Sequence, residues 1–118
     1  MKKNKKPAHF YCDLFGANIY FFVGWPEKEF SKYLMKNYNT PVETNDSNGM
    51  TKQIIHNGSP IIMIWIRSGK RLLPTLVHES IHATNLILYV AGVRPSFIND
   101  ELQAYYSAML FKFGIENK

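Results

Sequence analysis

The chain has 118 residues, which is enough for one hydrophobic core but too few for two ordinary domains. Its hydrophobic content of 46% and charged content of 19% exclude wholesale disorder. The net charge of +5 comes mainly from lysines at the start of the chain, so it does not by itself establish a nucleic-acid partner.

The N-terminal segment and the cysteine content indicate how the chain is organised and in which compartment the protein lies. Residues 1–8 carry these lysines and predict a flexible basic tail, followed by one folded domain over residues 9–118. The single cysteine, Cys12, excludes an intramolecular disulfide. No apolar run has the length of a membrane span, and no signal-peptide cleavage site is evident. The sequence therefore predicts a cytoplasmic protein with no membrane partner, and it indicates no oligomeric state.

The first half of the chain is rich in strand-forming residues. Aromatic and β-branched runs at residues 9–15 and 18–23, joined at Gly16-Ala17, predict a hairpin. Pro26 then opens a predicted helix, in which apolar residues recur at helical spacing: Phe30, Tyr33, Leu34 and Tyr38. Residues 40–50 are rich in turn formers and predict an exposed loop.

A second hairpin is predicted further along the chain. Residues 51–56 and 61–67 are β-prone runs on either side of Asn57-Gly58, a dipeptide typical of hairpin turns. Pro60 favours a connection of three or four residues and an edge position in the sheet, because proline cannot donate a ladder hydrogen bond.

Two helices are predicted after this hairpin. Pro74 lies in the first turn of a helix that continues to about Ala91, before a glycine stop. A last helix begins near Ser96 or Asn99 and ends at Gly114. Together the elements predict an α+β fold, in which a small antiparallel or mixed sheet of two hairpins combines with three helices.

The longer of these two helices carries the sequence His78-Glu79-Ser80-Ile81-His82, which matches the pattern H-E-x-x-H. Residues four apart lie on one face of a helix, so the two imidazoles can bind one Zn²⁺. Glu79 is not a ligand in this arrangement. Its carboxylate is placed to take a proton from water as the water attacks a carbonyl group. The motif therefore predicts a zinc-dependent hydrolytic site.

A catalytic zinc needs a third protein ligand and an open fourth position. No histidine follows His82, which leaves three downstream carboxylates: Asp100, Glu101 and Glu116. Glu116 lies past the predicted end of the last helix. Glu101 lies in the first turns of that helix, which a short connection folds back against the zinc helix. We therefore predict Glu101 as the third ligand, with Asp100 as the alternative.

The ligand spacing resembles a known family. His78-Glu79-x-x-His82, eighteen further residues and then Glu101 is similar to H-E-x-x-H-x₁₈-E, the pattern of the gluzincin metallopeptidases. The segments VHESIHA and NDELQAYY also resemble small zincin-like metallopeptidases encoded by phages and prophages, over roughly residues 76–110. The resemblance implies a compact zincin-like fold, in which the zinc helix packs on the C-terminal helix. It also implies zinc ligation by His78, His82 and Glu101 and general-base catalysis by Glu79.

The same resemblance implies a peptide or protein substrate that binds in extended form to an edge strand of the sheet. We expect the segment Ile61 to Ile66 to be that edge, because an extended peptide can add to it through main-chain hydrogen bonds.

Other parts of the site have several candidates. Larger gluzincins use a Tyr or His from a further domain to stabilise the oxyanion, and Tyr105, Tyr106 and His56 are the candidates here. Asn85, on the same helical face as His82, is a candidate to orient a ligand.

An alternative function is a non-catalytic zinc-containing phage protein, regulatory or nucleic-acid-binding, whose lysine tail contacts nucleic acid. The aromatic residues of the first hairpin do not support a base-stacking surface, because basic residues do not alternate with them. We expect these aromatic side chains to pack in the core.

Overall fold

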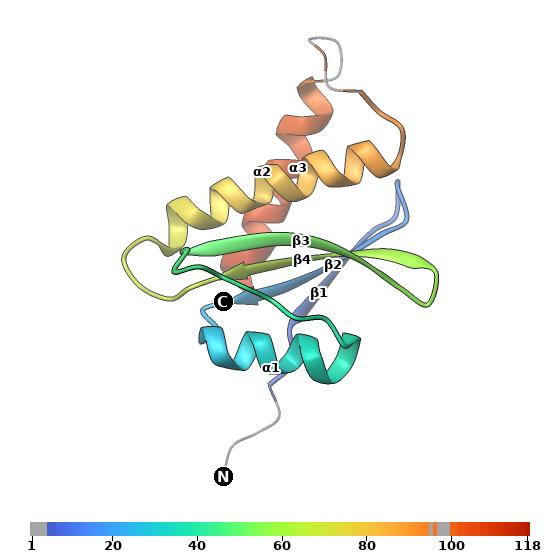
Figure 1. Ribbon diagram of the computed structural model, residues 1–118. Coiled ribbons are helices and arrows are strands. Elements are labelled where there is room, and N and C mark those ends of the chain that lie inside the picture. The colour runs from blue at the N-terminus through green and yellow to red at the C-terminus, as the bar shows by residue number, and fades with distance from the viewer. Residues whose placement is uncertain (1–4, 95, 97–99) are drawn as a thin grey trace.

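Three helices cover the two faces of a four-stranded sheet in the computed structural model, which describes residues 5–94, 96 and 100–118. In chain order the elements are β1 (Ala8–Cys12), β2 (Ala17–Val23), α1 (Glu27–Tyr38), β3 (Gly49–His56), β4 (Ser59–Ile66), α2 (Leu72–Val90) and α3 (Asp100–Glu116). Helix α1 lies on one face of the sheet, and α2 and α3 lie on the other (Figure 1). The predicted α+β class with two hairpins and three helices is confirmed.

The sheet joins two antiparallel hairpins through a parallel pair in its middle. β1 pairs with β2 and β3 pairs with β4, both in antiparallel register. β2 and β4 run parallel, from the pair Asn18 and Ile61 to the pair Val23 and Ile66. The strand order is therefore β1-β2-β4-β3, and the sheet is mixed. β1 and β3 form its two edges.

The expectation that Ile61 to Ile66 forms an edge is wrong. This segment belongs to β4, which lies between β2 and β3, and all six of its residues are buried. A strand without alternation between polar and apolar residues is typical of a position covered on both faces of a sheet. The edge on this side of the sheet is β3, whose residues are only partly buried or exposed.

The turn between β3 and β4 is tighter than predicted. Asn57 and Gly58 have φ angles of 52° and 79°, and His56 pairs directly with Ser59, so the connection has two residues rather than three or four. Positive φ at both positions is typical of a type I′ hairpin turn. Pro60 is tolerated in a central strand because the pairing with β2 begins only at Ile61.

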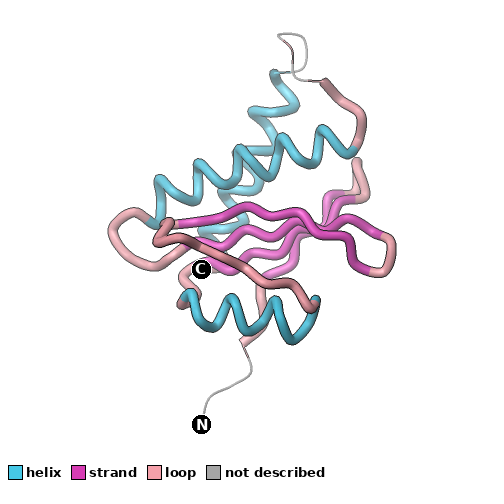
Figure 2. Tube along the Cα trace, in the orientation of Figure 1, coloured by secondary structure: helices cyan, strands magenta, loops and turns pink. Residues whose placement is uncertain are grey.

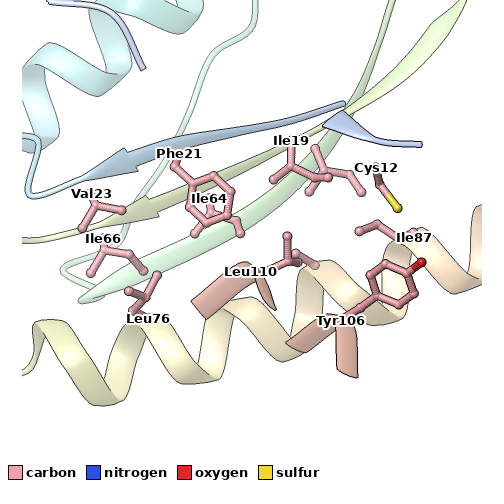
Figure 3. Close-up of a cluster of buried hydrophobic side chains, with 12 residues drawn as sticks. Cys12, Ile19, Phe21, Val23, Ile64, Ile66, Leu76, Ile87, Tyr106 and Leu110 are labelled. Carbon is pink, nitrogen blue, oxygen red and sulfur yellow. The ribbon is translucent and has the colours of Figure 1, made fainter. Parts of the chain in front are cut away.

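Apolar clusters on both faces of the sheet hold the helices against it. Figure 3 shows the cluster between the sheet and helices α2 and α3, which includes Ile19, Phe21, Val23, Ile64, Ile66, Leu76, Ile87, Tyr106 and Leu110. The cluster between the sheet and α1 includes Phe22, Trp25, Phe30, Leu34, Met63 and Trp65. Phe21 and Phe22 face opposite clusters because successive side chains of a strand point to opposite faces. Of the aromatic residues of the first hairpin, Phe21 and Phe22 are buried in the core, as expected, and Phe10, Phe15 and Tyr20 pack against it. Tyr11 is an exception, because it is 51% exposed.

Helix α3 continues past Gly114, where the sequence predicted its end. It ends at Glu116, and Gly114 is buried against α2. A Cβ atom at Gly114 would lie 2.8 Å from Cδ1 of Leu76 and 3.0 Å from its Cδ2. The glycine allows the two helices to approach closely here, and it does not act as a helix stop.

Some predicted features lie outside the described residues. These are residues 1–4 of the basic tail and Asn99, one of the two predicted caps of α3. Ser96 precedes the helix, which begins at Asp100, and β1 begins at Ala8, the last residue of the predicted tail. Among the helices of the described part of the chain, none combines the length and the apolar character needed to cross a bilayer.

Candidate active site

The two histidines of the motif lie together on the exposed face of α2. His78 and His82 are one helical turn apart, and their Nε2 atoms are separated by 3.0 Å. Their rings meet nearly at right angles, with an interplanar angle of 78°. Two nitrogens that bind one tetrahedral zinc at 2.0 to 2.1 Å are about 3.3 Å apart. The imidazole pair is therefore spaced within a few tenths of an ångström of two zinc ligands.

Glu79 lies on the side of α2 that faces the sheet. It is only 8% exposed, and the hydroxyl of Thr51 on β3 donates a hydrogen bond to its Oε1 at 2.6 Å. The same hydroxyl is 3.1 Å from the main-chain oxygen of Glu79. Oε2, the other carboxylate oxygen, lies 3.9 Å from Nε2 of His78. Thr51 therefore holds one oxygen of the carboxylate while the other faces the histidines.

Gly49, the first residue of β3, permits this contact between the helix and the edge strand. A Cβ atom at Gly49 would lie 2.5 Å from Cγ2 of Thr75, 3.0 Å from the main-chain oxygen of Trp65 and 3.2 Å from Cγ of Glu79. Any side chain at this position would therefore push against α2 and β4. The absence of one lets α2 lie close enough for Thr51 to reach Glu79.

A cleft follows the boundary between α2 and β3. Its volume is about 1020 Å³, and its polar lining includes Thr51, Glu79, His82 and Asn85. The apolar part of its lining comprises Met50, Leu86, Tyr89 and Val93. A smaller cavity of about 440 Å³ contains His78 and shares Gly49 and Glu79 with the cleft. The motif is therefore accessible from both sides of Glu79.

Glu101 and Asp100 lie at the start of α3, and both are exposed. Across residues 5–94, 96 and 100–118, no group of three His, Cys, Asp or Glu side chains is arranged to hold a metal ion. The structure therefore brings His78 and His82 together, but it does not bring Glu101 or Asp100 into a three-ligand group with them. Glu116 is at the far end of the same helix.

Asn85 connects the motif helix to α3. Its Oδ1 accepts a hydrogen bond of 2.6 Å from Nε2 of Gln103, two residues after Glu101 in the chain. This bond ties the first turns of α3 to the helical face that carries His82. Asn85 thus links the two helices that supply the predicted ligands.

The predicted oxyanion candidates lie in different places. Tyr106 is buried in the core, where burial raises the pKa of its phenol. His56 is at the turn end of β3 and contacts the ring of Tyr38, whereas Glu79 contacts the opposite end of that strand. Tyr105 is 64% exposed and contacts the ring of Tyr106. None of these three side chains lines the cleft.

Sequence reasoning missed Thr51, Gly49 and Gln103. Each acts through a contact between elements that are distant along the chain, and no local pattern marks any of them. An H-E-x-x-H motif predicts neither the strand that packs against its glutamate nor the residues of that strand.

No protein-family model, curated protein or solved structure matches this chain.

Proposed function

We propose that this protein is a zinc-dependent metallopeptidase that hydrolyses peptide bonds of an extended substrate. The observation that carries the proposal is a pair of imidazole nitrogens only 3.0 Å apart, with an oxygen of the Glu79 carboxylate 3.9 Å from Nε2 of His78. Glu79 and His82 line a cleft that follows an edge strand. This combines a metal-binding pair, a carboxylate and a strand that can pair with a peptide. Such a set is what hydrolysis of an amide bond requires.

His78 and His82 would supply two zinc ligands, and Glu101 the third. The spacing of the imidazoles supports the first two. For Glu101, the support is its position in the first turn of α3, which the hydrogen bond between Gln103 and Asn85 holds against the motif helix. Glu101 is exposed, so packing does not hold its side chain in a single rotamer.

Zinc held at this place would supply Lewis acidity, which polarises a peptide carbonyl and makes water more acidic. Glu79 would act as the general base. Its Oε1 accepts the bond from Thr51, so Oε2 remains available to take a proton from the attacking water and to pass it to the leaving amine. Glu79 lines the cleft, and its low exposure limits the contact of its side chain with bulk water.

The substrate would bind as an extra strand beside β3. An edge strand presents unpaired N–H and C=O groups, which an extended peptide can pair with. Gly49, Met50 and Thr51 of β3 line the same cleft as Glu79 and His82. A peptide paired with this end of β3 would therefore run past the carboxylate. The apolar lining residues would accept a hydrophobic side chain next to the scissile bond.

The test is Glu79→Gln, with hydrolysis of fluorescently labelled casein and zinc content as the two measurements. We expect the variant to retain zinc and to lose about 10²-fold or more of the activity, because a general base typically contributes that much. Glu29→Gln, an exposed change of the same charge on α1, is the matched control and should retain full activity. Hydrolysis by Glu79→Gln at the wild-type rate would refute the proposal.

A further inference from the structure

Four exposed lysines line an open cavity of about 790 Å³ beside α1: Lys5, Lys6, Lys32 and Lys36. We call this cavity the lysine cleft. Glu29 is the one acidic residue in its lining, so four positive charges face a single negative one. The lysines come from two segments that are distant along the chain, the N-terminal segment and α1. The fold therefore gathers basic residues that the sequence keeps apart.

Among the described residues that line the lysine cleft, Glu29 alone offsets its positive charge. Within the described part of the chain, none of the four lysines takes part in an ion pair. The ammonium group of Lys5 lies 5.0 Å from the ring centre of Trp25, which fixes its place above an apolar floor. A second cavity, of about 600 Å³, shares Lys5 and Lys6 with the first and extends the basic surface.

The lysines of helix α1 are regularly spaced along the helix. Lys28, Lys32 and Lys36 are exposed and follow one another at intervals of four residues. Four residues of an α-helix rise about 6 Å, and residues four apart lie on the same side of the helix. The lysines of α1 therefore form a row of positive charges along one side of the helix, and such a row suits a polyanion.

We propose that the lysine cleft binds the phosphate backbone of a nucleic acid without regard to base sequence. Lysines contact phosphates as point charges, and phosphate contacts carry affinity but little sequence information. Trp25 is only 4% exposed, so it is not available to stack on bases. The binding is therefore electrostatic, and it depends strongly on salt.

Other anionic partners fit the lysine cleft less well. Stable binding to a lipid surface usually combines basic residues with apolar side chains that insert next to them. On α1, Met35 is the one large apolar side chain that is exposed. A small phosphorylated molecule would use the N–H groups of a helix N-terminus. The first turn of α1 carries Glu27 and Glu29, whose carboxylates would compete with a phosphate for these N–H groups.

The lysine cleft and the histidine pair lie in different layers of the molecule. α1 covers one face of the sheet, and α2, which carries His78 and His82, covers the other (Figure 1). A nucleic acid at α1 therefore leaves the cleft along β3 open. The inference is independent of zinc and of peptidase activity, and its test needs neither.

The test measures binding of fluorescent single-stranded and duplex oligonucleotides of mixed sequence by anisotropy, over a range of salt concentrations. We expect log K to fall with log[salt] with a slope of about −3 to −4, which corresponds to four phosphate contacts. Lys32→Glu/Lys36→Glu should weaken binding about tenfold or more and reduce the magnitude of the slope by about 2. Arg71→Glu/Lys112→Glu changes the net charge equally on the side of α2 and α3, and should retain most of the affinity.

Three results would overturn the proposal. The first is the absence of salt-dependent binding, and the second is equal weakening by the two charge-reversal variants, which would show an effect of net charge alone. The third is tighter binding to phosphatidylserine-containing vesicles than to either oligonucleotide at the same salt concentration, which would assign the lysine cleft to a lipid surface. Circular dichroism of each variant verifies that it is folded.

Discussion

The hydroxyl of Thr51, on an edge strand, donates a hydrogen bond of 2.6 Å to the carboxylate of Glu79, on the helix that crosses it. This contact connects the strand that would receive a substrate to the residue that would activate water. It makes Thr51 a positioning residue for Glu79.

Replacement of Thr51 tests that role. Thr51→Val keeps the shape of the side chain but leaves Oε1 of Glu79 without its donor, and a hydrogen bond to a charged group contributes about 1.5 to 3 kcal/mol. We expect kcat for casein peptides to fall about tenfold to a hundredfold with little change in KM. Thr51→Ser restores the hydroxyl and should recover most of kcat. A rise in KM alone in Thr51→Val would show that the strand, and not Glu79, was affected.

Zinc binding distinguishes the two carboxylates at the start of α3. Glu101→Gln should lower zinc affinity, as measured by competition with a chromogenic chelator, by about 10²-fold or more if a ligand is lost. Asp100→Asn, the neighbouring change of the same charge, is the matched control. Full zinc affinity in Glu101→Gln together with a loss in Asp100→Asn would transfer the ligand role to Asp100.

Gly49→Ala should destabilise the fold. The added methyl group meets Cγ2 of Thr75 and the main-chain oxygen of Trp65, and overpacking of this kind costs about 1 to 3 kcal/mol. Urea unfolding monitored by tryptophan fluorescence measures the loss. Thr75→Ser removes Cγ2, so Gly49→Ala/Thr75→Ser should recover part of the stability. The contact with Trp65 remains in that variant, and full recovery would contradict this account.

The loop before β3 should respond to pH through Glu27. Hydrogen bonds from Thr44 and Arg67 hold the pKa of the Glu27 carboxyl below its ordinary value of 4.5. Arg67 also donates to the main-chain oxygen of Ser47, so this cluster fixes the loop that leads from α1 to the edge strand (Figure 2).

A lowered pKa in the folded state stabilises the fold at pH values above the unfolded pKa, and this contribution is lost as pH falls through the folded pKa. Glu27→Gln should therefore lower the urea midpoint at pH 7. The difference from the wild type should shrink at pH values below 4.5 and disappear once the folded carboxyl is protonated. Glu43→Gln, an exposed change in the same loop, is the control. A constant difference from pH 7 down to pH 3 would show that the charge of Glu27 is not the cause.

The helices and hairpins were predictable because their signals are local. The spacing of Phe30 and Leu34 predicted α1, and Asn57-Gly58 predicted the second hairpin. The approach of His78 and His82 also follows from one turn of a helix. Strand order was not predictable in the same way, because the pairing of β2 with β4 joins segments separated by a helix and a strand.

Two predictions are wrong because each rests on a single residue and not on the residues that surround it in the fold. Pro60 alone indicates an edge strand, yet the apolar run after it has the composition of a strand buried on both faces. Gly114 alone indicates a helix stop, yet it is the point where α3 touches Leu76. In both cases the deciding interaction is tertiary, and the residue alone does not reveal its partner.

The parallel pairing in the middle of the sheet has a consequence for synthesis of the protein. A ribosome releases β2 well before β4, so the inner side of the first hairpin remains without its neighbour until the chain has grown through residue 66. During that interval, α1 lacks the part of its apolar cluster that β4 supplies, namely Ile61, Met63 and Trp65. A nascent chain arrested before Ser59 should therefore be sensitive to proteases and prone to self-association, and protection should come abruptly once the last strand of the sheet leaves the exit tunnel.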